Sequence, residues 1–218
     1  MTSSILELPR TRPTSGTAES GRDEARTPWT GSVARGAAGQ GRHGVEIALL
    51  GPVRAWDRGC PLFPGTPVQQ ALLAMLALRA GMEVSVAELV EGIAGPVLEG
   101  EAGPLEEELH VHAARVRRLL RRTGDGGALR STGGGYRLAI RPSLVDAIAF
   151  EHTIGDARVL MGIDPDAAEL LLDGALGRWR GAPLQGVPGP FAEWERIRLW
   201  DLHDEASVML RRLRLLRR

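Results

Sequence analysis

The chain has 218 residues, of which 43% are hydrophobic, and this is enough to build one or two domains with cores of their own. Its 27 basic residues balance 27 acidic ones, so the net charge gives no sign of a nucleic-acid partner. Every basic residue is arginine, and the absence of lysine excludes a Walker A phosphate loop, a Schiff-base enzyme and a protein kinase.

The sequence contains no apolar run of membrane-spanning length and no recognisable signal peptide. Its one cysteine, Cys60, cannot form a disulfide within the chain, as is typical of a protein from a reducing compartment. We therefore expect a cytoplasmic protein without membrane contact.

The first part of the chain changes from a polar tail to short strands. Residues 1–43 are rich in Ser, Thr, Gly, Pro and Ala and lack apolar periodicity, so we expect a disordered tail. The apolar run over 45–51 predicts a strand, and residues 53–63 indicate strand, turn and strand. Together these segments predict a small N-terminal β-sheet.

Two helices are expected next. Pro67 suits the first turn of a helix over residues 67–81, and Gly81 suits its end. Ser85 followed three residues later by Glu88 is a capping box, which indicates that a short second helix begins there. A loop rich in glycine and proline follows.

A third helix is expected over 104–122 and a glycine-turn hairpin over 128–140. The order of sheet, three helices and hairpin is the outline of a winged helix-turn-helix with an N-terminal β-sheet, in which the third helix would enter the major groove. We assign this domain to residues 44–141.

After Pro142 the sequence predicts helices only. One starts near Asp146, a second is opened by Asp164 as cap and Pro165 as first residue, and a long third helix starts near Phe191. Three such helices resemble the start of a tetratricopeptide-like array, although no 34-residue repeat is visible. The expected fold is therefore an α+β winged helix-turn-helix followed by an all-α helical domain over 142–218.

The third helix carries five arginines and no acid over residues 109–122. On a helical wheel the apolar residues gather on one side, and this core stripe consists of Leu105, Leu109, Ala113, Val116, Leu119 and Leu120. The opposite side carries Val111, Ala114, Arg118, Arg121 and Arg122, with His110, Arg115 and Arg117 on its flanks. The arginines therefore cover the solvent face of the helix without interrupting its buried face.

Two interpretations of this face are open, an ordinary solvated surface or a surface that meets DNA. Arginine binds guanine edges and phosphates in a bidentate manner, and the helix occupies the recognition position of the predicted domain. Three acids, Glu106, Glu107 and Glu108, argue the other way, because in the first turn they would suit the helix dipole but repel phosphate. DNA binding would then depend on segregated charge, not on net charge.

Other chemistry is not supported by the sequence. His110 and His112 lie about 200° apart on a helix and cannot share a metal ion. The glycine turn at 133–136 joins strands and does not open a helix, so it does not indicate a phosphate cradle. No pair of nucleophile and base has a recognisable spacing. We expect no enzyme activity, no metal and no cofactor.

Seven stretches of the chain carry a resemblance to a known family. They are 45-VEIALLGPV-53, 68-VQQALLAMLALRAGMEVSVAELVEGI-93, 109-LHVHAARVRRLL-120, 132-TGGGYRLAI-140, 145-VDAIAFE-151, 178-RWRGAPL-184 and 191-FAEWERIRLWDLHDEA-206. In this order, over about 45 to 210, they resemble the Streptomyces antibiotic regulatory proteins, which join an OmpR-type winged helix to a bacterial transcriptional activator domain. The activator domain would be a short one here.

The resemblance implies a transcriptional activator that binds direct repeats in double-stranded DNA upstream of secondary-metabolite genes and recruits RNA polymerase, either as a monomer or as a homodimer on DNA. Family members often carry threonine in place of Glu108 and serine in place of Ala114, so the target preference is open. The alternative is a protein-interaction module, or a decayed member with weak or no DNA binding. The expected DNA contacts are His110, Val111, Ala114, Arg115, Arg117, Arg118, Arg121, Arg122, Arg130, Thr132 and Arg137.

Overall fold

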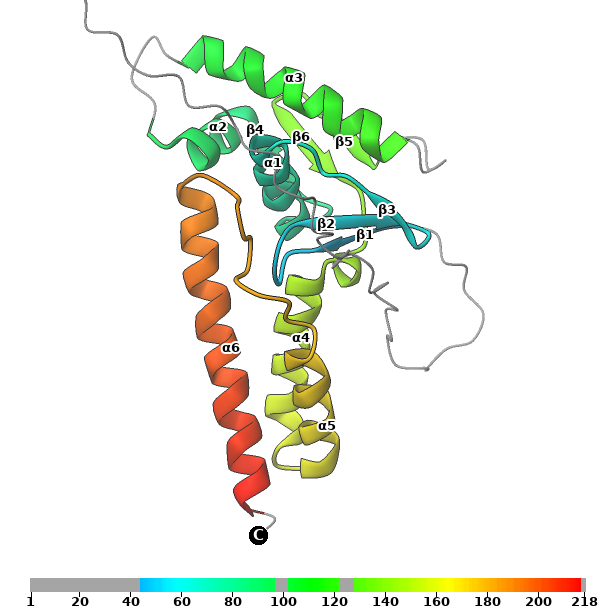
Figure 1. The fold of residues 1–218 in the computed structure, drawn as a ribbon, viewed down its shortest axis with the longest axis vertical. Helices are drawn as coiled ribbons and strands as arrows, with labels where there is room; N and C mark the ends of the chain where they lie inside the picture. Colours follow the sequence, from blue (N-terminus) through cyan, green and yellow to red (C-terminus); the bar gives the residue numbers. More distant parts are fainter. Residues whose placement is uncertain (1–43, 97–101, 122–127, 217–218) are drawn as a thin grey trace, which may run out of the picture. The chain divides into compact units, whose positions relative to one another are not determined.

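The computed structural model describes residues 44–96, 102–121 and 128–216, and the expected tail over 1–43 lies outside them. Three short strands open the described chain: β1 (Val45–Ala48), β2 (Arg54–Asp57) and β3 (Cys60–Leu62) form an antiparallel sheet in the order β1-β2-β3 (Figure 1). The sequence predicted this N-terminal sheet.

Three helices follow, α1 (Pro67–Leu78), α2 (Val86–Ala94) and α3 (Ala102–Arg121), and then the hairpin of β5 (Leu129–Ser131) and β6 (Gly135–Leu138). Helix α1 ends earlier than its predicted end at Gly81, a residue with φ of 82°. Between α1 and α2 the structure adds β4 (Glu83–Ser85), which pairs with β6, so the second sheet has the order β4-β6-β5. The sequence analysis missed β4, because three residues are too few to show alternation.

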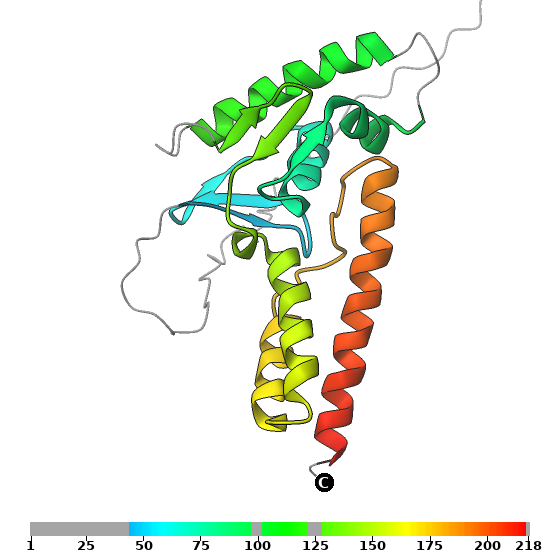
Figure 2. The ribbon, with the colours of Figure 1, turned by 180° about the vertical axis from the view of Figure 1, so that it is seen from behind.

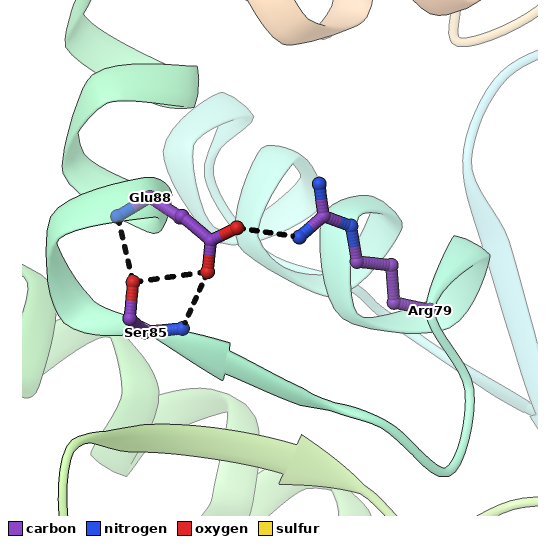
Figure 3. A network of polar contacts seen from close by, with 3 residues as sticks. All are labelled: Arg79, Ser85 and Glu88. Atoms are coloured by element: carbon purple, nitrogen blue, oxygen red, sulfur yellow. Dashed lines mark hydrogen bonds and ion pairs between the residues drawn. The ribbon is translucent and has the colours of Figure 1, made fainter.

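A polar network fixes the start of α2 (Figure 3). The Ser85 hydroxyl accepts a hydrogen bond from the Glu88 backbone N–H at 3.2 Å, and the Glu88 carboxylate accepts one from the Ser85 backbone N–H at 3.0 Å. This is the capping box that the sequence predicted. Arg79, just after α1, donates a further hydrogen bond to Glu88 at 2.8 Å, so one carboxylate ties the end of α1 to the start of α2.

The same network makes the stability of the protein depend on pH. The Arg79 guanidinium, followed by the hydrogen bonds from Ser85, lowers the pKa of Glu88 from 4.5 to about 2. The stabilisation from this carboxylate is therefore present above pH 4.5 and is lost as the pH falls towards 2. We expect Glu88→Gln to reduce the loss of unfolding free energy across that window, by a modest amount because half of the side chain is exposed.

Urea unfolding at several pH values would measure this effect. Glu91→Gln is the matched control, since Glu91 is an exposed acid on the same helix. An identical pH dependence in Glu88→Gln and the wild-type protein would contradict the assignment.

The remaining elements are a single 3-10 turn, η1 (Pro142–Leu144), and three helices: α4 (Asp146–Leu160), α5 (Pro165–Leu176) and α6 (Pro190–Leu216). Asp164 caps α5 by accepting a hydrogen bond from the Ala167 N–H at 3.0 Å, with Pro165 in the first turn as predicted. Helices α4, α5 and α6 pack against one another, and α6 lies alongside α4 in both views (Figures 1 and 2).

Asp146, the first residue of α4, joins these helices to the first sheet. Its buried carboxylate accepts hydrogen bonds from the backbone N–H groups of Leu49 at 2.6 Å and Leu50 at 3.4 Å, and Arg180 lies 3.3 Å away. Burial raises the pKa of Asp146, against the effect of these donors. Residues 41–218 form one compact unit, so the domain boundary expected near 142 falls inside it and stays a prediction.

None of the helices within residues 44–96, 102–121 and 128–216 is both long and apolar enough to span a lipid bilayer.

Candidate nucleic-acid interface

Helix α3 is packed against the rest of the protein through one apolar face. Leu109, Ala113, Val116 and Leu120 are buried, and the helix packs against α1 and α2. These residues recur at three- and four-residue intervals and therefore form one stripe. The burial matches the core stripe expected from the wheel, except that Leu105 and Leu119 are only half-buried.

The opposite face of α3 carries the cations. Arg115, Arg118 and Arg121 are exposed, as are Val111 and Ala114 between them. Neither a hydrogen bond nor an ion pair is found for these three guanidinium groups among the described residues. Each can therefore offer its planar set of donors to a ligand without giving up a partner that the structure records.

A second group of side chains fastens the hairpin to α3. The Arg117 guanidinium donates hydrogen bonds to the Leu129 carbonyl at 3.3 Å and to the Ser131 hydroxyl at 2.5 Å, and it lies 5.8 Å from the centre of the Tyr136 ring. The ring nitrogen Nδ1 of His110 lies 2.6 Å from the Tyr136 hydroxyl. Burial raises the pKa of Tyr136, so its hydroxyl remains a donor at neutral pH. Arg117 and His110 thus contact the protein itself.

No sequence pattern assigned a role to Tyr136. The only signal in the sequence was its position directly after three glycines. A large aromatic side chain that follows a glycine turn is expected to pack against a neighbouring element. The structure shows that it packs beside α3, where it meets both His110 and Arg117.

The hairpin places its own polar residues next to α3. Arg130 is exposed, while Thr132 and Arg137 are half-buried. Arg137 stands opposite Glu83 on one side and Arg130 on the other in the β4-β6-β5 sheet. Of the expected DNA contacts, Arg122 lies outside the described residues. The rest are present on α3 and the hairpin.

The glutamates that precede the arginines are not where the sequence analysis put them. Helix α3 begins at Ala102, so its first turn contains no acid, and the dipole argument for Glu106, Glu107 and Glu108 was wrong. Gly103 and Pro104 lie inside the helix because the first-turn N–H groups need no intrahelical acceptor. Glu107 and Glu108 are exposed, on the same helix as the arginines.

A chain of polar contacts runs beneath this end of α3. The backbone N–H of Thr66 donates to Gln69 Oε1 at 3.2 Å, which turns the Gln69 amide nitrogen towards Nδ1 of the buried His112, 3.3 Å away. Nε2 of His112 then lies 3.4 Å from the Glu108 carboxylate. His112 is therefore a core histidine with partners on both ring nitrogens. Within the described chain no cluster of His, Cys, Asp and Glu could hold a metal ion.

Comparison with known proteins identifies several transcriptional regulators. The regulatory protein AfsR of Streptomyces coelicolor is 36% identical over 161 residues, which cover 72% of this chain and 15% of that protein. The transcriptional regulator RedD of the same organism is 34% identical over 211 residues, or 87% of this chain and 59% of that protein. This chain thus spans less than two thirds of either relative. No family model matches it.

The fold is also similar to a solved structure, Mycobacterium tuberculosis EmbR in complex with a low-affinity phosphopeptide. The TM-score is 0.71 at 25% sequence identity, and the match covers 78% of this chain and 45% of EmbR. The sequence and structural similarities agree with the resemblance inferred from the seven stretches. The chain belongs to the family of Streptomyces antibiotic regulatory proteins and AfsR-type transcriptional regulators.

Proposed function

We propose that this protein is a sequence-specific DNA-binding transcriptional activator of a secondary-metabolite pathway, which acts in the cytoplasm and is not an enzyme. The observation that carries the proposal is the exposed arginine face of α3, formed by Arg115, Arg118 and Arg121 beside the anchored β5–β6 hairpin. The regulatory relatives support it.

In this proposal α1, α2 and α3 with the hairpin form a winged helix-turn-helix. Helix α3 enters the major groove, where arginine can read guanine and bind phosphate. Arg130 and Thr132 on the hairpin contact the sugar-phosphate backbone of the DNA next to the groove. Arg117 and His110 contribute by holding the hairpin at a set distance from α3, since both contact it directly.

Helices α4, α5 and α6 form the start of a tetratricopeptide-like activator domain. The protein binds direct repeats in a promoter and recruits RNA polymerase, which is the part of the proposal that rests on family membership alone.

The test is fluorescence anisotropy with a duplex from the region upstream of the gene for this protein and a scrambled duplex of equal length. We expect tighter binding to the upstream duplex, and an affinity that falls steeply between roughly 50 and 200 mM salt because released counterions drive phosphate binding. Equal affinity for both duplexes would remove the claim of sequence specificity, and no binding to either would overturn the proposed function.

One observation favours a second function, a protein-interaction module that does not bind DNA. Glu107 and Glu108 are exposed on the helix that would meet phosphate. If these two carboxylates lie near the DNA phosphates, replacing both glutamates with glutamine should strengthen DNA binding by roughly 3- to 30-fold. The reason is that each repulsion between a carboxylate and a phosphate at close range costs about 1 kcal/mol in water. Glutamine at 108 still accepts a hydrogen bond from His112.

The same anisotropy assay measures this change, with Glu193→Gln on α6 as the control that removes an exposed acid elsewhere. Unchanged affinity in the double variant would show that these glutamates do not face phosphate. If the wild-type protein does not bind DNA but the double variant does, the two glutamates prevent DNA binding in this protein. That result would favour the second function.

A further inference from the structure

One face of α6 is uncovered although it carries large apolar side chains. Trp194 is 72% exposed, Ile197 57%, Val208 55% and Leu215 69%. Both ribbon views show α4 on one side of α6 and no described element along its other side (Figures 1 and 2). Exposed apolar side chains in a row on one helix are typical of a surface that binds another protein.

The opposite face of α6 is fully used. Leu199, Ala206, Met209, Leu210 and Leu213 are buried, and α6 packs against α2, α4 and α5. Arg214 near its end donates hydrogen bonds to Glu169 at 3.1 Å and Asp173 at 2.7 Å on α5. The helix is therefore held in place by one face along its length, and the other face is available.

The uncovered residues follow the heptad spacing of a two-helix seam. Counting seven residues at a time, one position holds Trp194, Asp201, Val208 and Leu215, and the position three residues later holds Ile197, Asp204 and Arg211. At about 100° per residue these seven side chains stay within about 100° of arc. This alternation of four- and three-residue steps is the a and d pattern of a coiled coil, here with charges in its centre.

The order of the charges selects the direction of the partner helix. A parallel copy would place Asp201 against Asp201, Asp204 against Asp204 and Arg211 against Arg211, and like charges in contact repel. In an antiparallel copy, the numbers of any two facing residues add up to the same value. When this sum is about 412, Asp201 lies opposite Arg211 and Ile197 lies opposite Leu215. Val208 then faces Asp204, whose carboxylate lies within one turn of Arg212 of the other helix.

We propose that α6 forms an antiparallel, two-fold symmetric pair with α6 of a second copy of this chain. Each contact occurs twice, because the pair is isologous: two Asp201–Arg211 ion pairs and two Ile197–Leu215 apolar contacts. The ion pairs select the orientation and the apolar contacts supply most of the affinity. The seam is short, so the expected Kd is on the order of micromolar. It uses no residue of α3 and requires no DNA, so it is a contact between chains in solution, distinct from the head-to-tail placement that direct repeats impose on two DNA-bound chains.

Charge reversal tests the pair directly. In sedimentation velocity on the full chain across a concentration series, we expect Asp201→Arg or Arg211→Asp alone to weaken the dimer by at least tenfold. The double variant Asp201→Arg with Arg211→Asp should restore it, because the two charges exchange places. Asp156→Arg, at an exposed acid of α4, is the control and should leave the dimer unchanged. Circular dichroism checks that each variant folds.

A wild-type chain that stays monomeric at all concentrations would overturn the proposal. A dimer that survives both single reversals would also overturn it, since another surface would then form the contact. Failure of the double variant to dimerise would remove the Asp201–Arg211 pairing.

A cross-link separates the two orientations even if a charge variant folds poorly. Chains with Ile197→Cys and chains with Leu215→Cys, both with the exposed Cys60 replaced by serine, are oxidised separately and as a mixture. The antiparallel pair predicts a disulfide-linked dimer in the mixture. Efficient cross-linking of Ile197→Cys chains alone would instead show a parallel pair and contradict the proposal.

Discussion

Replacing Arg118 and Arg121 together with alanine is expected to weaken the binding of this protein to its upstream duplex by roughly 30-fold or more. Each arginine that contacts a base or a phosphate contributes about 1–3 kcal/mol, so two such losses exceed 2 kcal/mol. Both side chains are exposed on the uncovered face of α3, so their removal leaves the buried stripe intact. The loss should therefore appear in DNA binding and not in stability.

Anisotropy titrations at several salt concentrations measure both the affinity and its salt dependence. If the two arginines contact phosphates, the slope of log affinity against log salt should become shallower by about two. The control is Arg54→Ala with Arg141→Ala, which removes two exposed arginines outside α3 and the hairpin. Unchanged affinity in Arg118→Ala with Arg121→Ala would refute the assignment of the α3 face to DNA.

Gly135→Ala is expected to destabilise the protein by about 3 kcal/mol or to prevent the hairpin from pairing with β4. A Cβ atom at this position would lie 2.0 Å from the Val84 carbonyl oxygen and 2.8 Å from the Ser85 Cα, both in the backbone of β4. Backbone atoms cannot turn aside as a flexible side chain can, so the strands must separate. The Tyr136 contacts with His110 and Arg117 would be disturbed along with β6.

Gly133→Ala provides the matched control two residues away, because a Cβ there meets nothing within 4 Å. We expect its unfolding free energy to stay within about 0.5 kcal/mol of the wild-type value. Thermal and urea unfolding of both variants test the comparison. Equal stability of Gly135→Ala and Gly133→Ala would mean that β4 does not approach β6 as closely as the structure shows.

Several features of the fold could be predicted because they depend on residues near one another in the chain. Ser85 and Glu88 form the expected capping box, and Asp164 caps α5. The wheel of α3 placed its leucines inside and its arginines outside, because a helical period turns sequence spacing directly into a face. The arginine face, which is the main part of the candidate site, was therefore visible before the structure was known.

Other features could not be predicted because they depend on partners far away in the chain. Glu83 to Ser85 becomes a strand only when β6 lies beside it. The role of Asp146 depends on backbone groups 96 and 97 residues earlier. The start of α3 at Ala102 also differed from expectation, because proline at 104 looked like the first residue of a helix and is tolerated two positions deeper, within the first turn.

The sequence by itself determined which residues of α3 face the core and which face solvent, and, apart from β4, it determined the order of strands and helices, because periodicity and caps act over a few residues. Only the tertiary structure decided which arginines remain free to bind. Arg117 is held by Leu129 and Ser131, whereas Arg118 and Arg121, on the same helix, are exposed and have no hydrogen bond or ion pair among the described residues. The difference arises because a guanidinium forms hydrogen bonds with any acceptor that folding brings close to it. The spacing of residues along α3 does not predict which acceptors the hairpin supplies.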